Sequence, residues 1–262
     1  MLRAPAFDRN RLVHLRDVVF VLVRRDFRAR YKHTSVGMLW SVLNPLLFLA
    51  IFYVVFAHGL DLLETPRLSG IFIAILSWQW VQAGLNQAAA SITGNSNLIG
   101  QPSFPVEALP VVSTITSLVN FLIALPLLAL FMLFEGFTLG MTALWLPVIL
   151  TIQFVMILSA SYFVAAMNVG FRDVEQSLPI VLQLGYFITP IFYELGSLSS
   201  SIKAFVLLNP VTHLVEAYRA ILLHQEAPDW RALIAILVCS LLLLLVTVAY
   251  FRSSRSRFLE EL

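Results

Sequence analysis

The sequence is poor in charge for a chain of its length. Asp, Glu, Lys and Arg supply 12% of its 262 residues, whereas hydrophobic residues supply 59%. A soluble domain carries about 25% charged residues, so this chain has too few charged side chains to cover a surface in contact with water. The shortage argues against a soluble enzyme, a nucleic-acid-binding protein and a disordered chain, and it predicts an integral membrane protein.

Groups that support chemistry at membrane depth are also scarce. The one cysteine, Cys239, excludes an internal disulfide framework and a cysteine-based zinc site. Every Asp lies outside the long apolar runs, and the histidines lie at or beyond the ends of those runs. Intramembrane proteases and proton-coupled carriers need such groups inside the membrane. Both classes are therefore disfavoured, and we expect neither a catalytic residue nor a metal site.

A loop that binds nucleotide phosphates is missing as well. Such a loop places Gly-Lys-Ser/Thr at the start of a helix, but the two lysines follow Tyr31 and Ile202. We therefore expect no cofactor in this chain. If the protein moves a substrate uphill, a separate partner subunit has to bind ATP and Mg²⁺ and supply the work.

Long apolar runs are what the sequence does contain. A helix needs about 18 residues or more to cross a membrane core of ~30 Å, and six runs approach or exceed this length. An all-α bundle of six transmembrane helices is therefore predicted over residues 38–251, in a single transmembrane domain that covers residues 1–262. The predicted spans are Met38–Phe56, Gly70–Ala90, Ala108–Phe134, Met141–Val169, Leu178–Phe192 and Ala232–Phe251.

Two further segments are predicted to be helical without crossing the membrane. Residues 1–37 combine many arginines with apolar residues at close to helical spacing, which predicts an amphipathic cytoplasmic helix at the membrane interface. Between the fifth and sixth spans, Asn209-Pro210 separates the apolar stretch 202–208 from the amphipathic stretch 211–223. We expect these stretches to form two short re-entrant helices.

The distribution of Lys and Arg predicts the orientation, because these residues favour the cytoplasmic side of a membrane. With both termini inside, most basic residues lie in the N-terminal segment, in the loop at Arg172 and in the cytoplasmic tail 252–262. The basic residues left outside are Arg67, Lys203, Arg219 and Arg231. We therefore expect a multi-pass protein with both termini in the cytoplasm.

Amides and aromatic rings occur inside the predicted spans, for example at Gln79, Gln153 and Gln183. The amides either form hydrogen bonds between helices or provide a neutral lining for a polar substrate such as a sugar. The aromatic rings near the outer ends of the second and fifth spans form either an interfacial belt or stacking surfaces at a pore exit. The residues that we assign to a pore lining are Trp78, Gln82, Asn86, Tyr186, Phe187 and Tyr193.

Short motifs follow one another along nearly the whole chain. They are Arg25-Asp26-Phe27, Arg30-Tyr31, Val36-Gly37, Trp40, Asn44-Pro45, Gln101-Pro102-Ser103-Phe104-Pro105, Phe171-Arg172-Asp173-Val174, Thr189-Pro190-Ile191-Phe192-Tyr193, Asn209-Pro210 and Ala217-Tyr218-Arg219. In this order they resemble the permease subunits of ABC exporters for polysaccharides, the group that exports O-antigen, teichoic acid and capsule. One departure is Gln101, where many members carry a basic residue.

The resemblance implies a homodimer of six-span subunits joined by two copies of a cytoplasmic ABC ATPase in the bacterial inner membrane. It also implies a lipid-linked polysaccharide as the substrate, with O-antigen favoured over capsular polysaccharide or teichoic acid. An intramembrane acyl- or glycosyltransferase is the alternative from another class, and an uncoupled scaffold or channel is a third. A transferase would need acidic or histidine groups at one membrane face, and only Asp61/Glu64 and Glu216/Arg219 come near that.

Three further groups of residues are candidates for transport roles. The loop 94–105 suits docking to the ATPase, or is an ordinary tight connection. The basic N-terminal helix either holds an anionic lipid headgroup or anchors and orients the chain. The break after the fifth span is either a periplasmic gate or a solvated helix pair. The candidates are Leu98, Ile99, Gln101 and Phe104 for coupling, Arg24, Arg25, Arg28 and Arg30 for the headgroup, and Asn209, Pro210, Glu216 and Arg219 for the gate.

Overall fold

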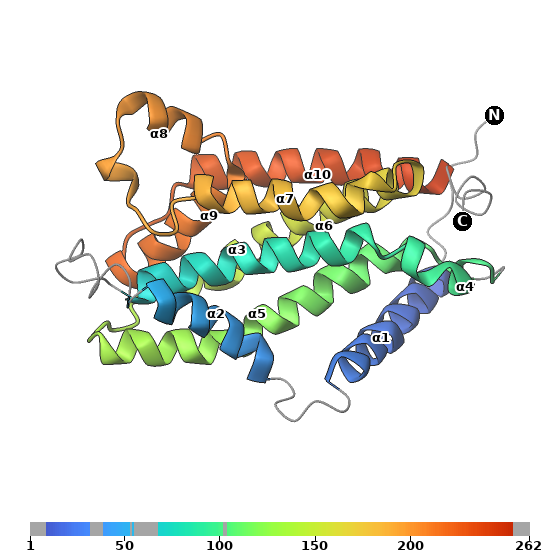
Figure 1. Cartoon of the computed structure of the whole chain (residues 1–262), viewed down its shortest axis with the longest axis horizontal. Helices are drawn as coiled ribbons and strands as arrows, with labels where there is room; N and C mark the ends of the chain where they lie inside the picture. The colour runs from blue at the N-terminus through green and yellow to red at the C-terminus, as the bar shows by residue number, and fades with distance from the viewer. Residues whose placement is uncertain (1–8, 32–38, 53, 55–67, 102–103, 254–262) are drawn as a thin grey trace.

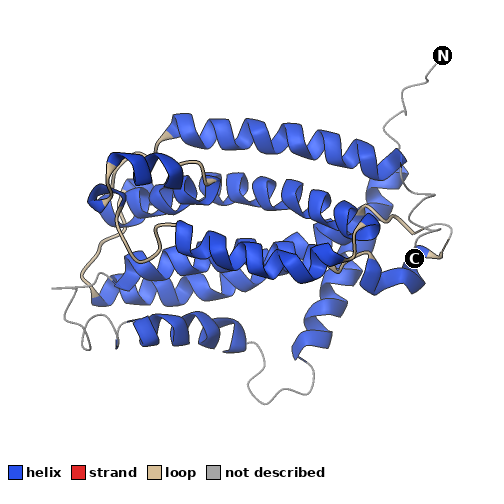
Figure 2. Ribbon diagram, turned by 45° about the horizontal axis from the view of Figure 1, so that its top comes forward, coloured by secondary structure: helices blue, strands red, loops and turns tan. Residues whose placement is uncertain are grey.

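The computed structural model describes residues 9–31, 39–52, 54, 68–101 and 104–253, and the described part is helical without strands (Figures 1 and 2). The main helices are α1 (Arg9–Tyr31), α2 (Leu39–Phe52), α3 (Leu68–Ala89), α4 (Ser96–Ile99), α5 (Ala108–Phe134), α6 (Leu146–Gly170), α7 (Asp173–Ile188), α8 (Ser200–Val206), α9 (Pro210–Arg219) and α10 (Trp230–Ser253). Short turns of other helix types complete the set: η2 (Thr93–Asn95), η3 (Met141–Trp145), η4 (Leu195–Ser197) and the π-turn η5 (Ala220–His224).

Four helical segments of the described chain are long and apolar enough to cross a membrane: Leu68–Ala89, Ala108–Phe134, Met141–Gly170 and Trp230–Phe251. They match the predicted second, third, fourth and sixth spans. The helices at the first and fifth predicted spans, α2 and α7, have 14 and 16 residues. The described part of the chain is thus all-helical, with four full-length candidate spans, as in a multi-pass membrane protein. Residues 38, 53, 55 and 56 of the predicted first span lie outside the described residues.

The predicted bounds of the fifth span were wrong at both ends. The predicted start is Leu178, but α7 begins at Asp173 and runs through Pro179. Pro179 lies beyond the first turn, so it removes one helical hydrogen bond, but the acidic first turn favours the helix start because it suits the positive end of the helix dipole. At the other end the helix stops at Ile188, so Thr189–Tyr193 is a non-helical segment.

The central helix of the bundle is α3, which packs against α2, α5, α6, α7 and α9 (Figure 1). Its buried side chains include Phe72, Ile73 and Trp80, which belong to the main apolar core. Gly84 allows close packing there, because a Cβ at this position would lie 2.7 Å from a methyl of Ile157. Packing on all sides explains why a helix of modest hydrophobicity can hold amides: few of its residues face lipid.

The two ends of the bundle carry different elements. Helices α1 and α4, the start of α7 and the end of α10 lie together at one end, and α8 and α9 lie at the other (Figure 1). The predicted N-terminal helix is present as α1, and Leu22 buries its side chain in a second apolar cluster with Ile99 and Phe104. Residues 1–8 and 32–37 of that predicted segment lie outside the described residues.

The predicted helix break between the fifth and sixth spans is confirmed. Asn209 caps α9, because its side-chain oxygen accepts the backbone N–H of Val211 at 3.0 Å, and Pro210 occupies the first helical position. Both features stabilise a helix start. The second helix extends as a π-turn to His224, and Gln225 then adopts a left-handed conformation with φ of 56°. Two short helices, α8 and α9, therefore occupy this segment.

Candidate functional site

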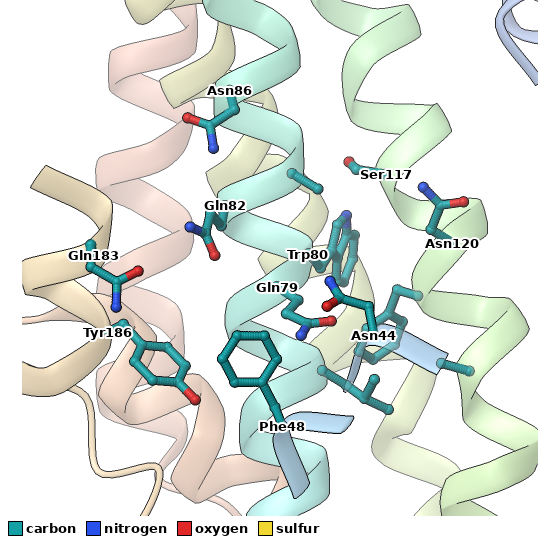
Figure 3. Close-up of a pocket in the computed structure, with 14 residues that line it drawn as sticks. Asn44, Phe48, Gln79, Trp80, Gln82, Asn86, Ser117, Asn120, Gln183 and Tyr186 are labelled. Atoms are coloured by element: carbon teal, nitrogen blue, oxygen red, sulfur yellow. The ribbon is translucent and has the colours of Figure 1, made fainter. Parts of the chain in front are cut away.

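An open groove of about 660 Å³ lies along one side of the bundle between α2, α3, α5 and α7 (Figure 3). Amides line it from all four helices: Asn44, Gln79, Gln82, Asn86, Asn120 and Gln183. Aromatic rings line it as well: Phe48, Trp80, Phe121 and Tyr186. Among the described residues that line the groove there is no Asp, Glu, Lys, Arg or His. The groove is therefore polar but uncharged.

Helical spacing explains how the sequence builds this lining. Gln79, Gln82 and Asn86 are three and four residues apart, so they project from one face of α3. Gln183 and Tyr186 are three apart on α7 for the same reason. In Figure 3 the side chains of Gln82 and Gln183 point into the space between α3 and α7. The groove thus forms where the polar faces of neighbouring helices meet.

Several polar atoms at the groove lack a hydrogen-bond partner within the described part of the chain. They are the indole nitrogen of Trp80, the side-chain oxygen of Asn86 and the hydroxyl of Tyr186. Buried polar groups in proteins nearly always have a partner, so these two donors and one acceptor mark places beside the groove where a bound water would be expected. Uncharged donors and acceptors beside aromatic rings match a ligand rich in hydroxyl groups.

The structure divides the residues assigned to a pore lining. Gln82, Asn86 and Tyr186 line the groove. Trp78 lies behind it, with its ring edge-to-face on Tyr186 at a centroid distance of 6.2 Å. Phe187 is 63% exposed on the outer side of α7. Tyr193 follows α7 and donates its hydroxyl to the carbonyl of Ile188 at 2.6 Å; burial raises the pKa of Tyr193, which keeps this donor protonated.

Sequence reasoning assigned no function to several groove residues. Asn44 was noted only as part of a motif, and Asn120 was not singled out, although it is an amide inside an apolar run and meets the criterion used for the others. Trp80 was counted among the aromatic rings near the outer end of the second span but was not assigned to the lining. Phe48 and Phe121 gave no signal, because isolated aromatic residues are common in membrane spans. Their position became visible only once α2 and α5 were placed against α3.

The amides of the fourth predicted span do not line the groove but connect helices. Gln153 is fully buried in α6 and donates to the carbonyl of Ser77 at 2.9 Å. Its oxygen accepts the hydroxyl of Tyr218 at 2.8 Å and that of Ser77 at 3.3 Å. This network fastens α9 to α6 and α3. Asn168 likewise connects the ends of α3 and α7.

The residues assigned to ATPase coupling lie in and after α4, at the end of the bundle that also holds α1. Ile99 and Phe104 are only 4% and 8% exposed, and Leu98 packs against the same cluster. The expected apolar knob is therefore turned inward, because these side chains find apolar neighbours on α1, α5 and α6. The exposed side chains are Ser96, Asn97 and Gln101. Pro102 and Ser103 lie outside the described residues.

The arginines assigned to a lipid headgroup differ in their surroundings. Arg24 and Arg28 are exposed on α1. Arg25 forms an ion pair with Asp26 at 2.9 Å and donates to the side-chain oxygen of Asn95 at 3.1 Å, so it ties α1 to the segment before α4. The side chain of Arg30 lies outside the described part of the structure.

The gate candidates are joined by hydrogen bonds across three elements. Arg219 pairs with Glu216 at 2.9 Å, as the spacing predicted, but it is not a solvated surface residue: its side chain is 11% exposed. It also donates to the carbonyl of Ile191 at 3.0 Å and to that of Gly70 at 3.2 Å. Asn209 donates to the hydroxyl of Thr189 at 2.8 Å. Both side chains thus fasten α9 to the segment after α7.

Comparison with known proteins identifies the family. The model of the family described as "ABC-2 type transporter" matches residues 17–223, which is most of the chain. The chain belongs to the ABC-2 type transporter family. It is the membrane component of such a transporter, and this decides between a transport subunit and an intramembrane transferase. An ABC transporter works with an ATPase subunit, so the chain requires such a partner.

Relatives of this ABC-2 transporter subunit match it along its full length. The chain is 31% identical to the "O-antigen export system permease protein RfbA" of Myxococcus xanthus over 96% of this chain and 97% of the relative. It is 25% identical to the protein of the same name from Klebsiella pneumoniae over the same shares. It is 24% identical to the "Polysialic acid transport protein KpsM" of Escherichia coli, covering 93% and 95%. The resemblance found in the sequence motifs is therefore confirmed.

Proposed function

We propose that this ABC-2 subunit conducts a lipid-linked polysaccharide, with O-antigen the first candidate, across the bacterial inner membrane while a separate ATPase drives the movement. The amide-lined groove carries this proposal. A glycan exposes many hydroxyl groups and the C–H faces of its rings, and the groove offers amides, unpaired donors and acceptors, and aromatic rings without a charged side chain. The full-length relatives named for O-antigen and polysialic acid support the same substrate class.

The proposed transporter is a homodimer with two ATPase copies. One side of the groove is open, and its flanks on α2 and α7 carry exposed apolar side chains such as Leu47, Ile51 and Leu184. Exposed apolar flanks beside a polar groove match contact with a second copy, which would close the groove into a conduit. In this arrangement α2 and α7 complete a six-span subunit. The short helices α8 and α9 dip into the periplasmic face, where Asn209, Pro210, Glu216 and Arg219 form the gate.

In the proposed membrane orientation, α1 and α4 lie on the cytoplasmic side, together with both termini. The exposed polar residues of α4 and Gln101 then face the ATPase, while Ile99 and Phe104 support them from inside. Arg24 and Arg28 on α1 are free to contact the anionic headgroup of the lipid-linked substrate. The basic residues of α1 and the end of α10 lie at the same end of the bundle, as the distribution of Lys and Arg requires.

Groove substitutions test the proposal. Gln82→Leu and Gln87→Leu change the same residue type on the same helix, but only Gln82 lines the groove. Each variant is produced with its ATPase in a strain that lacks O-antigen export, and surface glycan is measured by antibody labelling. We expect Gln82→Leu to lower surface glycan several-fold at unchanged protein level, and Gln87→Leu to behave as the parent chain. Equal export by both variants would rule out the groove as the conduit.

A further inference from the structure

A single buried amide connects the ATPase end of the chain to the helix that carries the groove wall. Asn168 lies in the last turns of α6 and is 1% exposed. Its side-chain nitrogen donates to the carbonyl of Ala89 at 2.8 Å, at the last residue of α3. Its side-chain oxygen accepts the backbone N–H of Glu175 at 3.0 Å, in the first turn of α7. One side chain thus satisfies terminal backbone groups of two helices.

Further weak contacts surround the same amide. The nitrogen of Asn168 lies 3.4 Å from the hydroxyl of Thr93 in η2 and 3.4 Å from a carboxylate oxygen of Glu175. The turn η2, which begins at Thr93, directly precedes α4 in the segment proposed to meet the ATPase. The amide therefore contacts the coupling segment, the end of α3 and the start of α7 at one point.

Apolar packing does not fill this junction completely. It borders a cavity of about 430 Å³, whose lining is polar throughout: Thr93, Ser96, Asn168, Arg172, Glu175 and Gln176. No apolar side chain among the described residues fills that space. Across this cavity, the hydrogen bonds of Asn168 hold the start of α7 against the end of α3 and the coupling segment. A polar cavity of this size also admits water, which can satisfy the backbone groups if the amide is removed.

The opposite end of α7 is fixed differently. Gly185 sits so close to Trp78 that an added Cβ would lie 2.7 Å from the indole ring, and Tyr186 packs on the same ring. Helix α7 is thus held to α3 by ring packing beside the groove and by Asn168 at the ATPase end. A displacement of the coupling segment therefore reaches α7 through Asn168.

We propose that Asn168 is a positioning residue that transmits movement of the ATPase-contacting segment to α7, and hence to Gln183 and Tyr186 in the groove wall. The proposal rests on the proposed function, because it presupposes an ATPase docked near α4. It assigns no contact between Asn168 and the substrate. Removing the amide should leave α6 and α7 folded and the ATPase bound. It should, however, uncouple the motion of α7 from that of the ATPase-contacting segment.

The test uses the complete complex with its co-purifying ATPase in nanodiscs. Cys239 is replaced by Ser, and a fluorophore is attached to Ser177→Cys, an exposed position in the second turn of α7. The change in fluorescence on ATP addition is measured beside the ATPase rate. We expect Asn168→Ala to keep the ATPase bound and hydrolysing at a rate close to that of the parent complex, while the ATP-dependent signal on α7 falls about fivefold or more.

Matched variants separate coupling from a loss of structure. Gln176→Leu removes a polar side chain from the same cavity but none of the hydrogen bonds of the junction, and it should retain the signal. Asn168→Gln keeps the amide on a longer side chain and should recover part of the ATP-dependent signal. If Asn168→Ala fails to assemble, Asn168→Gln decides the question: assembly with an unreduced ATPase rate but a reduced signal supports the inference, and a full signal overturns it.

The outcomes also distinguish this inference from the proposed function. If no ATPase co-purifies with the parent chain, the proposed function fails. If the ATPase binds and the parent complex responds to ATP, but Asn168→Ala responds equally, only the role of Asn168 is refuted. A parallel loss of ATPase rate, assembly and signal in both Asn168 variants would mean that the residue acts in folding alone, which also overturns the inference.

Discussion

Substitution of Arg219 distinguishes an anchoring role from a weak surface ion pair. An exposed pair three residues apart on a helix contributes only about 0–1 kcal/mol. The guanidinium of Arg219, however, is largely buried and donates to Glu216 and to the backbone carbonyls of Gly70 and Ile191. Its loss removes the donor to the carbonyl of Ile191 and a second donor to the carbonyl of Gly70, which lies inside α3. Hydrogen bonds to charged groups contribute about 1.5–3 kcal/mol each.

We therefore expect Arg219→Ala to destabilise the fold by about 3 kcal/mol, which counts both carbonyls at the lower end of that range. Glu216 is 37% exposed, so water can replace most of its pairing, and Glu216→Ala should cost about 1 kcal/mol or less. For a chain of this size, 1 kcal/mol corresponds to about 2–4 °C in the midpoint of thermal unfolding. Arg219→Ala should thus lower the midpoint by about 6–12 °C.

The assay is thermal unfolding of the purified chain in detergent, followed by intrinsic tryptophan fluorescence. Arg231→Ala removes an exposed arginine at the start of α10 and should leave the midpoint unchanged. Arg219→Lys retains the charge toward Glu216 but cannot place three donors in the same plane, so it should fall between the parent and Arg219→Ala. Equal midpoints for Arg219→Ala and Glu216→Ala would refute the anchoring role and would mean that the two residues form only a weak surface ion pair.

Three more substitutions test the packing directly. Gly185→Ala should displace α7 from Trp78 and lower both the unfolding midpoint and glycan export, because the new Cβ would lie 2.7 Å from the ring. Gln153→Leu leaves the hydroxyl of Tyr218 without its acceptor and should lower stability by about 1–3 kcal/mol, measured as a drop in the unfolding midpoint. Phe104→Asp places a carboxylate in an apolar cluster, so membrane-inserted protein should be lost before ATPase binding can be tested.

Each of these substitutions has a control in the same chain. Gly170→Ala adds a Cβ with no atom within 4 Å and should leave stability unchanged. Thr151→Val, on the exposed side of α6, should not reproduce the effect of Gln153→Leu. Gln101→Asp introduces the same charge as Phe104→Asp at an exposed position and should retain normal protein levels. If Phe104→Asp inserts normally but loses only the ATPase, the inward placement of Phe104 is wrong.

The sequence alone determined the class of the protein and much of its local structure. Low charge and long apolar runs predict a membrane protein, because the chain has too few charged side chains to cover a surface in water and its apolar runs are long enough to cross a bilayer. The spacing of Gln79, Gln82 and Asn86 already put their side chains on one helix face, and Asn209-Pro210 already marked a break. These features depend on residues close together in the chain, so periodicity and backbone stereochemistry reveal them.

The tertiary structure decided which faces meet. From the sequence, Gln82 and Gln153 are both amides in apolar helices, yet one lines the groove and the other closes a buried network with Tyr218. From the sequence, Arg219 was either a gate residue or half of a solvated pair, and only the tertiary structure placed the carbonyls of Gly70 and Ile191, distant in the chain, beside it. A side chain's role depends on neighbours contributed by other helices, and hydrophobic periodicity carries no information on which helices those are.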